Sequence, residues 1–260
     1  MNFLYSLKHK LAKVLAGYIE GRAKLFFERK PELWREITEY RSKSNSTGAQ
    51  YSDFEVLYKW VRKHKPKEVL ECGTGLTTMI MAFALKENEK DSGIVGRITS
   101  MEEYENYYTD AVNLMPKDLN KYVDIRLSPV VEECYQFVKG VRYTDVPDRD
   151  YELVFIDGPS FHTNPKMTDK YAFEMDYLWL LKDSQRKIPA IIDTRTAACF
   201  IYNLFLNNKF KFDRLRRIGV IYPASKDDIR TVNAIVHNAI SRGDFKRTSL
   251  IDTLSGEYFR

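Results

Sequence analysis

The sequence predicts an α/β fold in which a mostly parallel sheet of seven strands is covered by helices on both faces. From Lys67 onward, short apolar segments alternate with longer segments of helical periodicity, as in a parallel sheet with crossover helices. A glycine-rich turn at residues 73–78 joins the first of these strands to the next helix. The 260 residues suffice for one such domain and a helical appendage at the N-terminus.

The elements of this domain follow from hydrophobic periodicity. The expected strands cover residues 68–72, 96–101, 123–127, 153–156, 190–192, 211–215 and 219–222. The expected helices cover residues 78–86, 104–114, 130–139, 168–181 and 197–206. A polar, poorly patterned stretch at 41–50 predicts the boundary, so that residues 1–50 form a helical extension and residues 51–260 form the α/β domain with a C-terminal helical tail.

The first segment has the pattern of an amphipathic helix. Its apolar residues recur at helical spacing, with lysines between them: Phe3, Leu4, Leu7, Leu11, Val14, Leu15 and Tyr18, with Lys8, Lys10 and Lys13. Two roles stay open, because the helix can pack on the α/β domain or on a second subunit of a homo-oligomer, or lie on an anionic membrane surface. Further helices are expected at 31–40 and 54–64, the latter capped by Ser52 or Asp53.

Charge and cysteine usage exclude several classes of protein. Seven basic and two acidic residues among the first thirty account for the whole net charge of +5. The remaining chain is balanced, which argues against a nucleic-acid-binding domain. The three cysteines lie far apart without a CxxC pair, so neither a zinc site nor a disulfide framework is expected. No apolar run is long enough to span a membrane, and charges interrupt the start of the chain, so we expect a cytoplasmic protein that can contact a membrane peripherally.

An acidic residue precedes the glycine-rich turn in the stretch Glu71-Cys-Gly73-Thr74-Gly75-Leu-Thr77-Thr78. The two glycines allow a tight turn and a close approach to a ligand, and either threonine can cap the following helix. Dinucleotide-binding turns carry a third glycine where this chain has Thr78. A carboxylate at Glu71 would repel a phosphate, so the turn favours a cationic or hydroxyl-bearing ligand.

Carboxylates also follow two other predicted strands. Glu102 and Glu103 come after the second strand, where a carboxylate can accept hydrogen bonds from both hydroxyls of a ribose. Asp157 ends the fourth strand, and Gly158 and Pro159 turn the chain away. The carboxyl ends of parallel strands meet at one edge of the sheet. We therefore expect Glu71, Glu102 and Asp157 to converge there.

Two of these motifs, Glu71-Cys-Gly-Thr-Gly75 and Phe155-Ile-Asp157-Gly-Pro159, resemble those of class I S-adenosylmethionine-dependent methyltransferases. The resemblance covers about residues 51–224 and implies a Rossmann-like, doubly wound fold with S-adenosylmethionine as cofactor. It places Glu102 on the ribose, with Glu103 as the alternative, and Ser128 beside the adenine. The cofactor-binding residues that it implies are Glu71, Gly73, Thr74, Gly75, Thr77, Glu102, Ser128 and Asp157.

The resemblance also implies the chemistry. The Asn/Asp-Pro-Pro-Tyr/Phe motif of many amino methyltransferases is absent, so we expect methyl transfer to a hydroxyl of a small molecule or glycan. His162 is the candidate general base because histidine titrates near neutral pH, and Asp157 is the other catalytic candidate. A surface position for this loop histidine remains the alternative.

Two further questions stay open at this stage. Metal-dependent catechol-type enzymes have an Asp-Asn pair after the fifth strand, whereas this chain has Asp193 and Thr194, so no metal is expected. Asp193 and Arg195 can instead bind the acceptor or form a local ion pair. Two other functions remain: an NAD(P)-dependent oxidoreductase, or a non-catalytic Rossmann-like binding protein.

Overall fold

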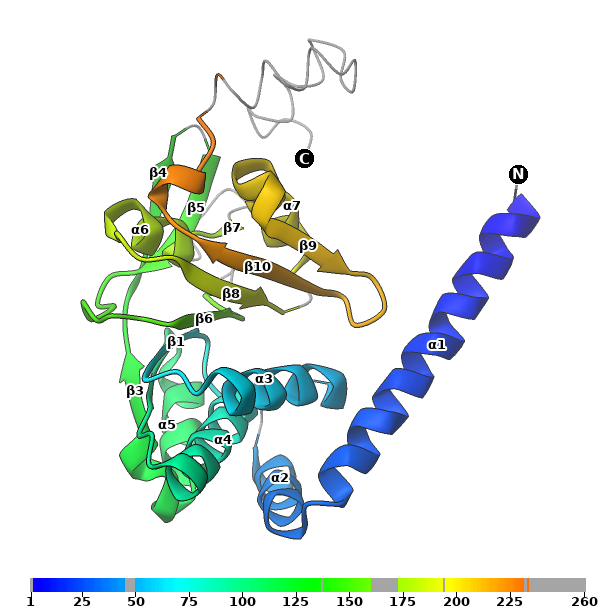
Figure 1. Cartoon of the computed structure of the whole chain (residues 1–260), viewed down its shortest axis with the longest axis vertical. Coiled ribbons are helices and arrows are strands. Elements are labelled where there is room, and N and C mark those ends of the chain that lie inside the picture. The colour runs from blue at the N-terminus through cyan, green and yellow to red at the C-terminus, as the bar shows by residue number, and fades with distance from the viewer. Residues whose placement is uncertain are drawn as a thin grey trace.

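The computed structural model describes residues 2–44, 50–136, 138–159, 173–193, 195–231 and 233. A seven-stranded sheet with the order β3-β2-β1-β6-β8-β10-β9 lies at its centre (Figure 1). In chain order these strands are β1 (Glu68–Cys72), β2 (Arg97–Glu102), β3 (Val123–Leu127), β6 (Leu153–Ile156), β8 (Ile188–Ile192), β9 (Phe210–Asp213) and β10 (Ile218–Ala224). The first five run parallel, and β10 is antiparallel to both of its neighbours. The predicted mostly parallel sheet of seven strands is therefore confirmed.

Helices cover the sheet on both faces, as predicted. In chain order, the domain's α-helices are α3 (Tyr51–His64), α4 (Leu76–Ser92), α5 (Glu105–Leu114), α6 (Asp176–Asp183) and α7 (Thr196–Leu206). Short 3₁₀ turns follow at η1 (Lys117–Tyr122), η2 (Asn207–Lys209) and η3 (Lys226–Asp228). Figure 1 shows α3 and α4 on one side of the sheet and α6 and α7 on the other.

The strands contribute alternate side chains to two separate cores. Val69 of β1 packs with α3 and α4, whereas its neighbour Leu70 packs with α6 and α7. In β6, Phe155 belongs to the core on the side of α3 and α4, and Val154 belongs to the core on the side of α6 and α7. Successive side chains of a strand point to opposite faces, so the continuous apolar runs in these strands are explained by burial on both faces.

The helix predicted at 130–139 is wrong. The chain forms an antiparallel hairpin of β4 (Val130–Tyr135) and β5 (Val138–Tyr143), which joins β7 (Phe173–Glu174) in a second sheet of order β4-β5-β7. The valines in this stretch favour strands, and Gln136 turns the chain with a φ of 55°. The helix expected at 168–181 is also wrong in its middle, because β7 precedes α6; residues 168–172 lie outside the described residues.

Two predicted helix starts are corrected by their caps. Gly75 precedes α4, so neither Thr77 nor Thr78 is its N-cap residue; α4 also continues to Ser92, beyond the predicted end at residue 86. Gln50 precedes α3, and the carboxylate of Glu20 accepts hydrogen bonds from the N–H groups of Tyr51 and Ser52 at 2.7 and 2.9 Å. A helix start leaves such N–H groups without partners inside the helix. Here their partner is the carboxylate of Glu20, which lies 31 residues before Tyr51 in the sequence.

The N-terminal helices α1 (Asn2–Glu28) and α2 (Pro31–Lys43) share a core with the domain. Phe27 of α1 and Leu33 and Ile37 of α2 are fully buried against α3 and α4. Figure 1 shows α1 as a long rod that meets the rest of the chain near α2 and α3, while its N-terminal end stands apart. Among the described residues, no helix is both long enough and apolar enough to cross a bilayer. Of the predicted C-terminal tail, residues 232 and 234–260 lie outside the described residues.

Candidate active site

The turns after β1 and β6 touch each other at the point where the strand order changes direction. Gly73 adopts a φ of 97°, and a Cβ atom built on it would lie 3.0 Å from the backbone of Asp157. A Cβ atom on Gly158 would in turn lie 2.9 Å from the backbone of Gly73. Glycine at both positions therefore allows this approach. In open α/β sheets such a switch point is where ligands bind.

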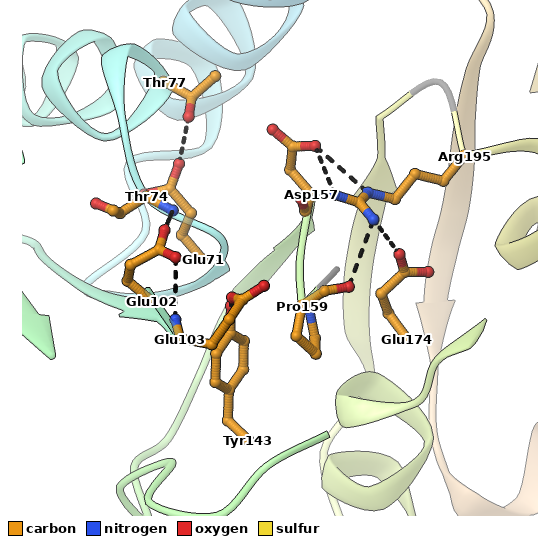
Figure 2. Close-up of polar contacts among 10 residues, drawn as sticks. All are labelled: Glu71, Thr74, Thr77, Glu102, Glu103, Tyr143, Asp157, Pro159, Glu174 and Arg195. Carbon is orange, nitrogen blue, oxygen red and sulfur yellow. Dashed lines mark hydrogen bonds and ion pairs between the residues drawn. The ribbon is translucent and has the colours of Figure 1, made fainter. Parts of the chain in front are cut away.

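Glu71 lies under the turn and holds it onto the start of α4. Its side chain is fully buried, and its carboxylate accepts a hydrogen bond from Thr77 Oγ1 at 2.5 Å (Figure 2). It also accepts hydrogen bonds from Thr78 Oγ1 at 2.5 Å and from Ser100 Oγ at 2.8 Å. Burial raises the pKa of Glu71 to about 7, against the opposing effect of the three hydroxyls. The oxygens of this predicted cofactor-binding residue are thus directed to protein hydroxyls, and Glu71 and Thr77 position the turn.

Glu102 at the end of β2 faces the same turn. Its Oε1 accepts the N–H groups of Glu103 and Tyr104 at 3.0 and 2.9 Å, and its Oε2 accepts the N–H of Thr74 at 3.4 Å. Burial raises the pKa of Glu102 to about 7, with a further contribution from Glu103. A carboxylate oxygen can accept two hydrogen bonds. Within the described residues, the long bond from Thr74 is the one that reaches Oε2, so this oxygen can still accept a ligand hydroxyl.

Two predicted residues near Glu102, Glu103 and Ser128, form hydrogen bonds within the protein. Glu103 accepts a 2.7 Å hydrogen bond from the hydroxyl of Tyr143 in β5. Ser128 is buried at the end of β3, where its hydroxyl donates to the carbonyl of Pro129 and accepts from the N–H of Asp145 at 3.1 and 3.2 Å. The side chain of Ser128 is therefore engaged within the protein.

Asp157 at the end of β6 is held by Arg195. Both Nε and Nη2 of Arg195 lie 3.4 Å from Oδ1 of Asp157, and the same guanidinium contacts the carbonyl groups of Asp157 and Pro159 and the carboxylate of Glu174 (Figure 2). Burial, and then the charge of Asp193, raise the pKa of Asp157, while Arg195 opposes this shift. About a third of the Asp157 side chain is exposed. The local ion pair considered for Arg195 is formed, with Asp157 and Glu174 as its partners.

Glu174 was missed by the sequence analysis. It lies in β7, is completely buried, and was assigned to a helix that does not form there. Burial raises its pKa to about 7, and Arg195 opposes this shift. Its partner lies 21 residues further along the chain, and no spacing in the sequence indicates such a pair.

His162 and Thr194 lie outside the described residues, so the structure does not place them. The described residues contain no cluster of three or more His, Cys, Asp and Glu side chains arranged to hold a metal ion. Figure 2 shows that Glu71, Glu102 and Asp157 lie at the same edge of the sheet. Their convergence, which follows from the adjacency of β2, β1 and β6, is confirmed.

Comparisons with known proteins add little to this geometry. No protein-family model and no curated protein sequence matches the chain. Three solved structures resemble it in fold: an O-methyltransferase from Streptomyces achromogenes involved in tomaymycin synthesis, in complex with S-adenosylmethionine; a methyltransferase from Podospora anserina bound to S-adenosylhomocysteine; and an O-methyltransferase from Bacillus cereus in complex with S-adenosylhomocysteine.

In the same order, sequence identity is 12, 14 and 16%, and TM-scores are 0.45, 0.46 and 0.45. The matches cover 73, 75 and 72% of this chain and 88, 73 and 90% of the other chains. Similarity at this level assigns no activity to the chain. The function has to be inferred from the residues of the site.

The site is rich in carboxyl groups. Figure 2 shows Glu71, Glu102 and Glu103 near the glycine-rich turn, and Asp157 and Glu174 in contact with the guanidinium of Arg195. Such a site repels phosphate and attracts cations. It also presents carboxylate oxygens that can bind hydroxyl groups.

Proposed function

We propose that this chain is an S-adenosylmethionine-dependent methyltransferase that transfers a methyl group to a hydroxyl of a small molecule or glycan. The proposal is carried by Glu102. Its Oε2 can accept a ligand hydroxyl, and it lies beside the glycine-rich turn at the switch point of the sheet. A buried carboxylate in this position suits the hydroxyls of a ribose.

The residues fit the rest of the cofactor as well. S-adenosylmethionine carries a positive sulfonium and an ammonium group, which match the acidic edge, whereas the pyrophosphate of NAD would be repelled by it. Gly73, Thr74 and Gly75 would pass beside the cofactor, while Glu71 and Thr77 hold the turn in place. Ser128, at the end of β3, would mark the adenine side. When bound, the cofactor supplies a methyl group on positively charged sulfur.

Asp157 is the described residue best suited to bind and deprotonate the acceptor hydroxyl. Arg195 contacts its Oδ1, and its Oδ2 can bind the acceptor hydroxyl. Burial raises the pKa of Asp157, which makes its carboxylate a stronger base. Asp157 can alternatively bind the ammonium group of the cofactor, in which case His162 would be the base. In both cases the chain acts mainly by holding the acceptor oxygen close to the methyl group.

The acidic edge also bears on the acceptor. A nucleic acid brings one phosphate per nucleotide, and each phosphate would be repelled by the carboxylates around Asp157. Neutral hydroxyl groups, such as those of a sugar or phenol, can instead donate hydrogen bonds to these carboxylates. We therefore propose a neutral or cationic acceptor and no role for nucleic acid.

Calorimetric titration tests the proposal. Wild type should bind S-adenosylmethionine and show no binding of NAD. Glu102→Gln should raise the dissociation constant for S-adenosylmethionine by about 10- to 100-fold, because a hydrogen bond to a charged acceptor is worth about 1.5–3 kcal/mol. Glu105→Gln, three residues away on the exposed surface of α5, is the matched control and should bind as wild type does.

Two outcomes would contradict the proposed function. Binding of NAD in place of S-adenosylmethionine would assign the site to an oxidoreductase. Equal affinity for S-adenosylmethionine in Glu102→Gln and wild type would remove Glu102 from the ribose site.

A further inference from the structure

Helix α1 has two opposite faces, and the domain uses one of them. Ala23 and Phe27 are fully buried, and Glu20 caps α3 from the same side of the helix. A second set of side chains forms what we call the outer stripe, with exposed fractions from 40 to 68%: Leu11, Val14, Leu15, Tyr18 and Leu25. At about 100° per residue, the centre of the outer stripe lies roughly 150° around the helix from Ala23 and Phe27.

Packing among the described residues therefore does not explain the outer stripe. Single exposed apolar residues are normal, but a continuous line of them along one helix marks an interaction surface. Figure 1 shows the N-terminal end of α1 standing apart from the other elements. Of the two roles expected for this helix, packing of its apolar side on the α/β domain is thus wrong for residues 11–18.

Charge decides between the remaining partners. Residues 2–19 of α1 contain Lys8, Lys10 and Lys13 and no acidic residue. The first acid of the helix, Glu20, is engaged with the N–H groups of Tyr51 and Ser52. A second copy of α1 laid parallel along the outer stripe would bring lysines near lysines, which is unfavourable. An anionic surface would complement them.

We propose that α1 docks the protein on an anionic membrane surface. The outer stripe would enter the boundary between headgroups and acyl chains, and Lys8 and Lys10, whose helix positions lie about 80° to either side of its centre, would contact the anionic headgroups. Tyr18, with an apolar ring and a polar hydroxyl, suits this interface. Arg22 lies next to it, and its long side chain can keep its charge at headgroup level.

The geometry of the fold permits this arrangement. The face of α1 that packs against α3 lies opposite the outer stripe, so the domain would stay on the water side of the helix. Docking would require no separation of Phe27 from its buried partners. Binding of α1 to vesicles can be tested separately from cofactor binding and methyl transfer.

Co-sedimentation of the full chain with vesicles tests the inference. Wild type should pellet with vesicles of phosphatidylcholine and phosphatidylglycerol and remain in solution with phosphatidylcholine alone. Lys10→Gln with Arg22→Gln should weaken binding to the anionic vesicles by about 25-fold, since each basic residue near the surface contributes about a fivefold factor. Val14→Ser with Tyr18→Ser should weaken it by about tenfold or more.

The control variants place the same changes elsewhere on the surface. Val95→Ser and Lys63→Gln alter exposed residues outside α1 and should bind vesicles as wild type does. All variants should keep the urea denaturation midpoint of wild type, followed by tryptophan fluorescence, which shows that the domain is folded. The inference is overturned if wild type binds neutral and anionic vesicles equally or neither of them. It is also overturned if the stripe variants leave vesicle binding unchanged but convert a dimer to a monomer, which would assign the stripe to a second copy.

Discussion

Replacing Arg195 should destabilise the fold because it leaves a buried carboxylate without its cation. The guanidinium contacts Glu174, which is completely buried, and reaches Asp157 and the carbonyl of Pro159. Removing one partner of a buried ion pair costs about 3–5 kcal/mol. About a fifth of the Arg195 side chain is exposed, so water can partly replace it, and we expect about 3 kcal/mol for Arg195→Met. Methionine retains most of the side-chain volume and limits cavity formation.

Urea denaturation followed by tryptophan fluorescence measures this loss. Arg186→Met is the matched control, because Arg186 pairs with Asp150 at 2.8 Å on the surface, with more than half of each side chain exposed. Such pairs contribute about 0–1 kcal/mol. In the Arg195→Met background, Glu174→Gln should restore about 2 kcal/mol by removing the buried charge.

The pH dependence provides a second test of the same argument. The pKa of Glu174 is already about 7, and loss of Arg195 should raise it further. The unfolded chain releases this proton at a lower pH than the folded chain, so the destabilisation should be larger at pH 8 than at pH 6. The reasoning is refuted if Arg195→Met loses no more stability than Arg186→Met, or if Glu174→Gln fails to relieve it.

Three further predictions concern other parts of the chain. Because burial raises the pKa of Glu71 from 4.5 to about 7, the free energy of unfolding should fall as pH rises from about 4.5 to about 7. In urea denaturation, Glu71→Gln should show a weaker dependence of this free energy on pH. The same pH dependence in Glu71→Gln and wild type would argue against this assignment. Glu20→Ala removes the acceptor at the start of α3 and should cost about 1–2 kcal/mol in the same assay; no measurable loss would show that water replaces it. Turnover can be measured with radiolabelled S-adenosylmethionine and an extract of hydroxyl-bearing acceptors. If Asp157 is the base, Asp157→Asn should reduce turnover by about 100-fold or more, and His162→Ala should change it little. The reverse result would assign proton removal to His162.

The sheet and its acidic edge could be predicted from the sequence because they depend on local patterns. A strand buried on both faces is mainly apolar, so β1, with Val69 and Leu70, and β6 were predicted with the observed bounds. The residue that ends a parallel strand lies at the edge where neighbouring strands also end. Glu71, Glu102 and Asp157 could thus be brought together without knowledge of their contacts.

The errors arose where long-range contacts decide the structure. The stretch 130–139 has apolar residues compatible with either a helix or a strand, and pairing with β7 makes β5 part of a sheet. The cap of α3 comes from Glu20, and the partner of Arg195 comes from β7. Neither contact has a signal in the sequence, because the residues that form it are remote from each other along the chain.

The sequence by itself determined the buried parallel strands of the central sheet, where the glycine-rich turn lies, and that carboxylates end three neighbouring strands. These properties follow from side-chain polarity and backbone freedom, which act over a few residues. The tertiary structure alone decided what each carboxylate does. It turned Glu71 inward to the hydroxyls of the turn, left Oε2 of Glu102 able to accept a ligand, and fixed Asp157 with Arg195. Hydrogen-bond partners are set by distances in space, and folding creates those distances between residues far apart in the chain.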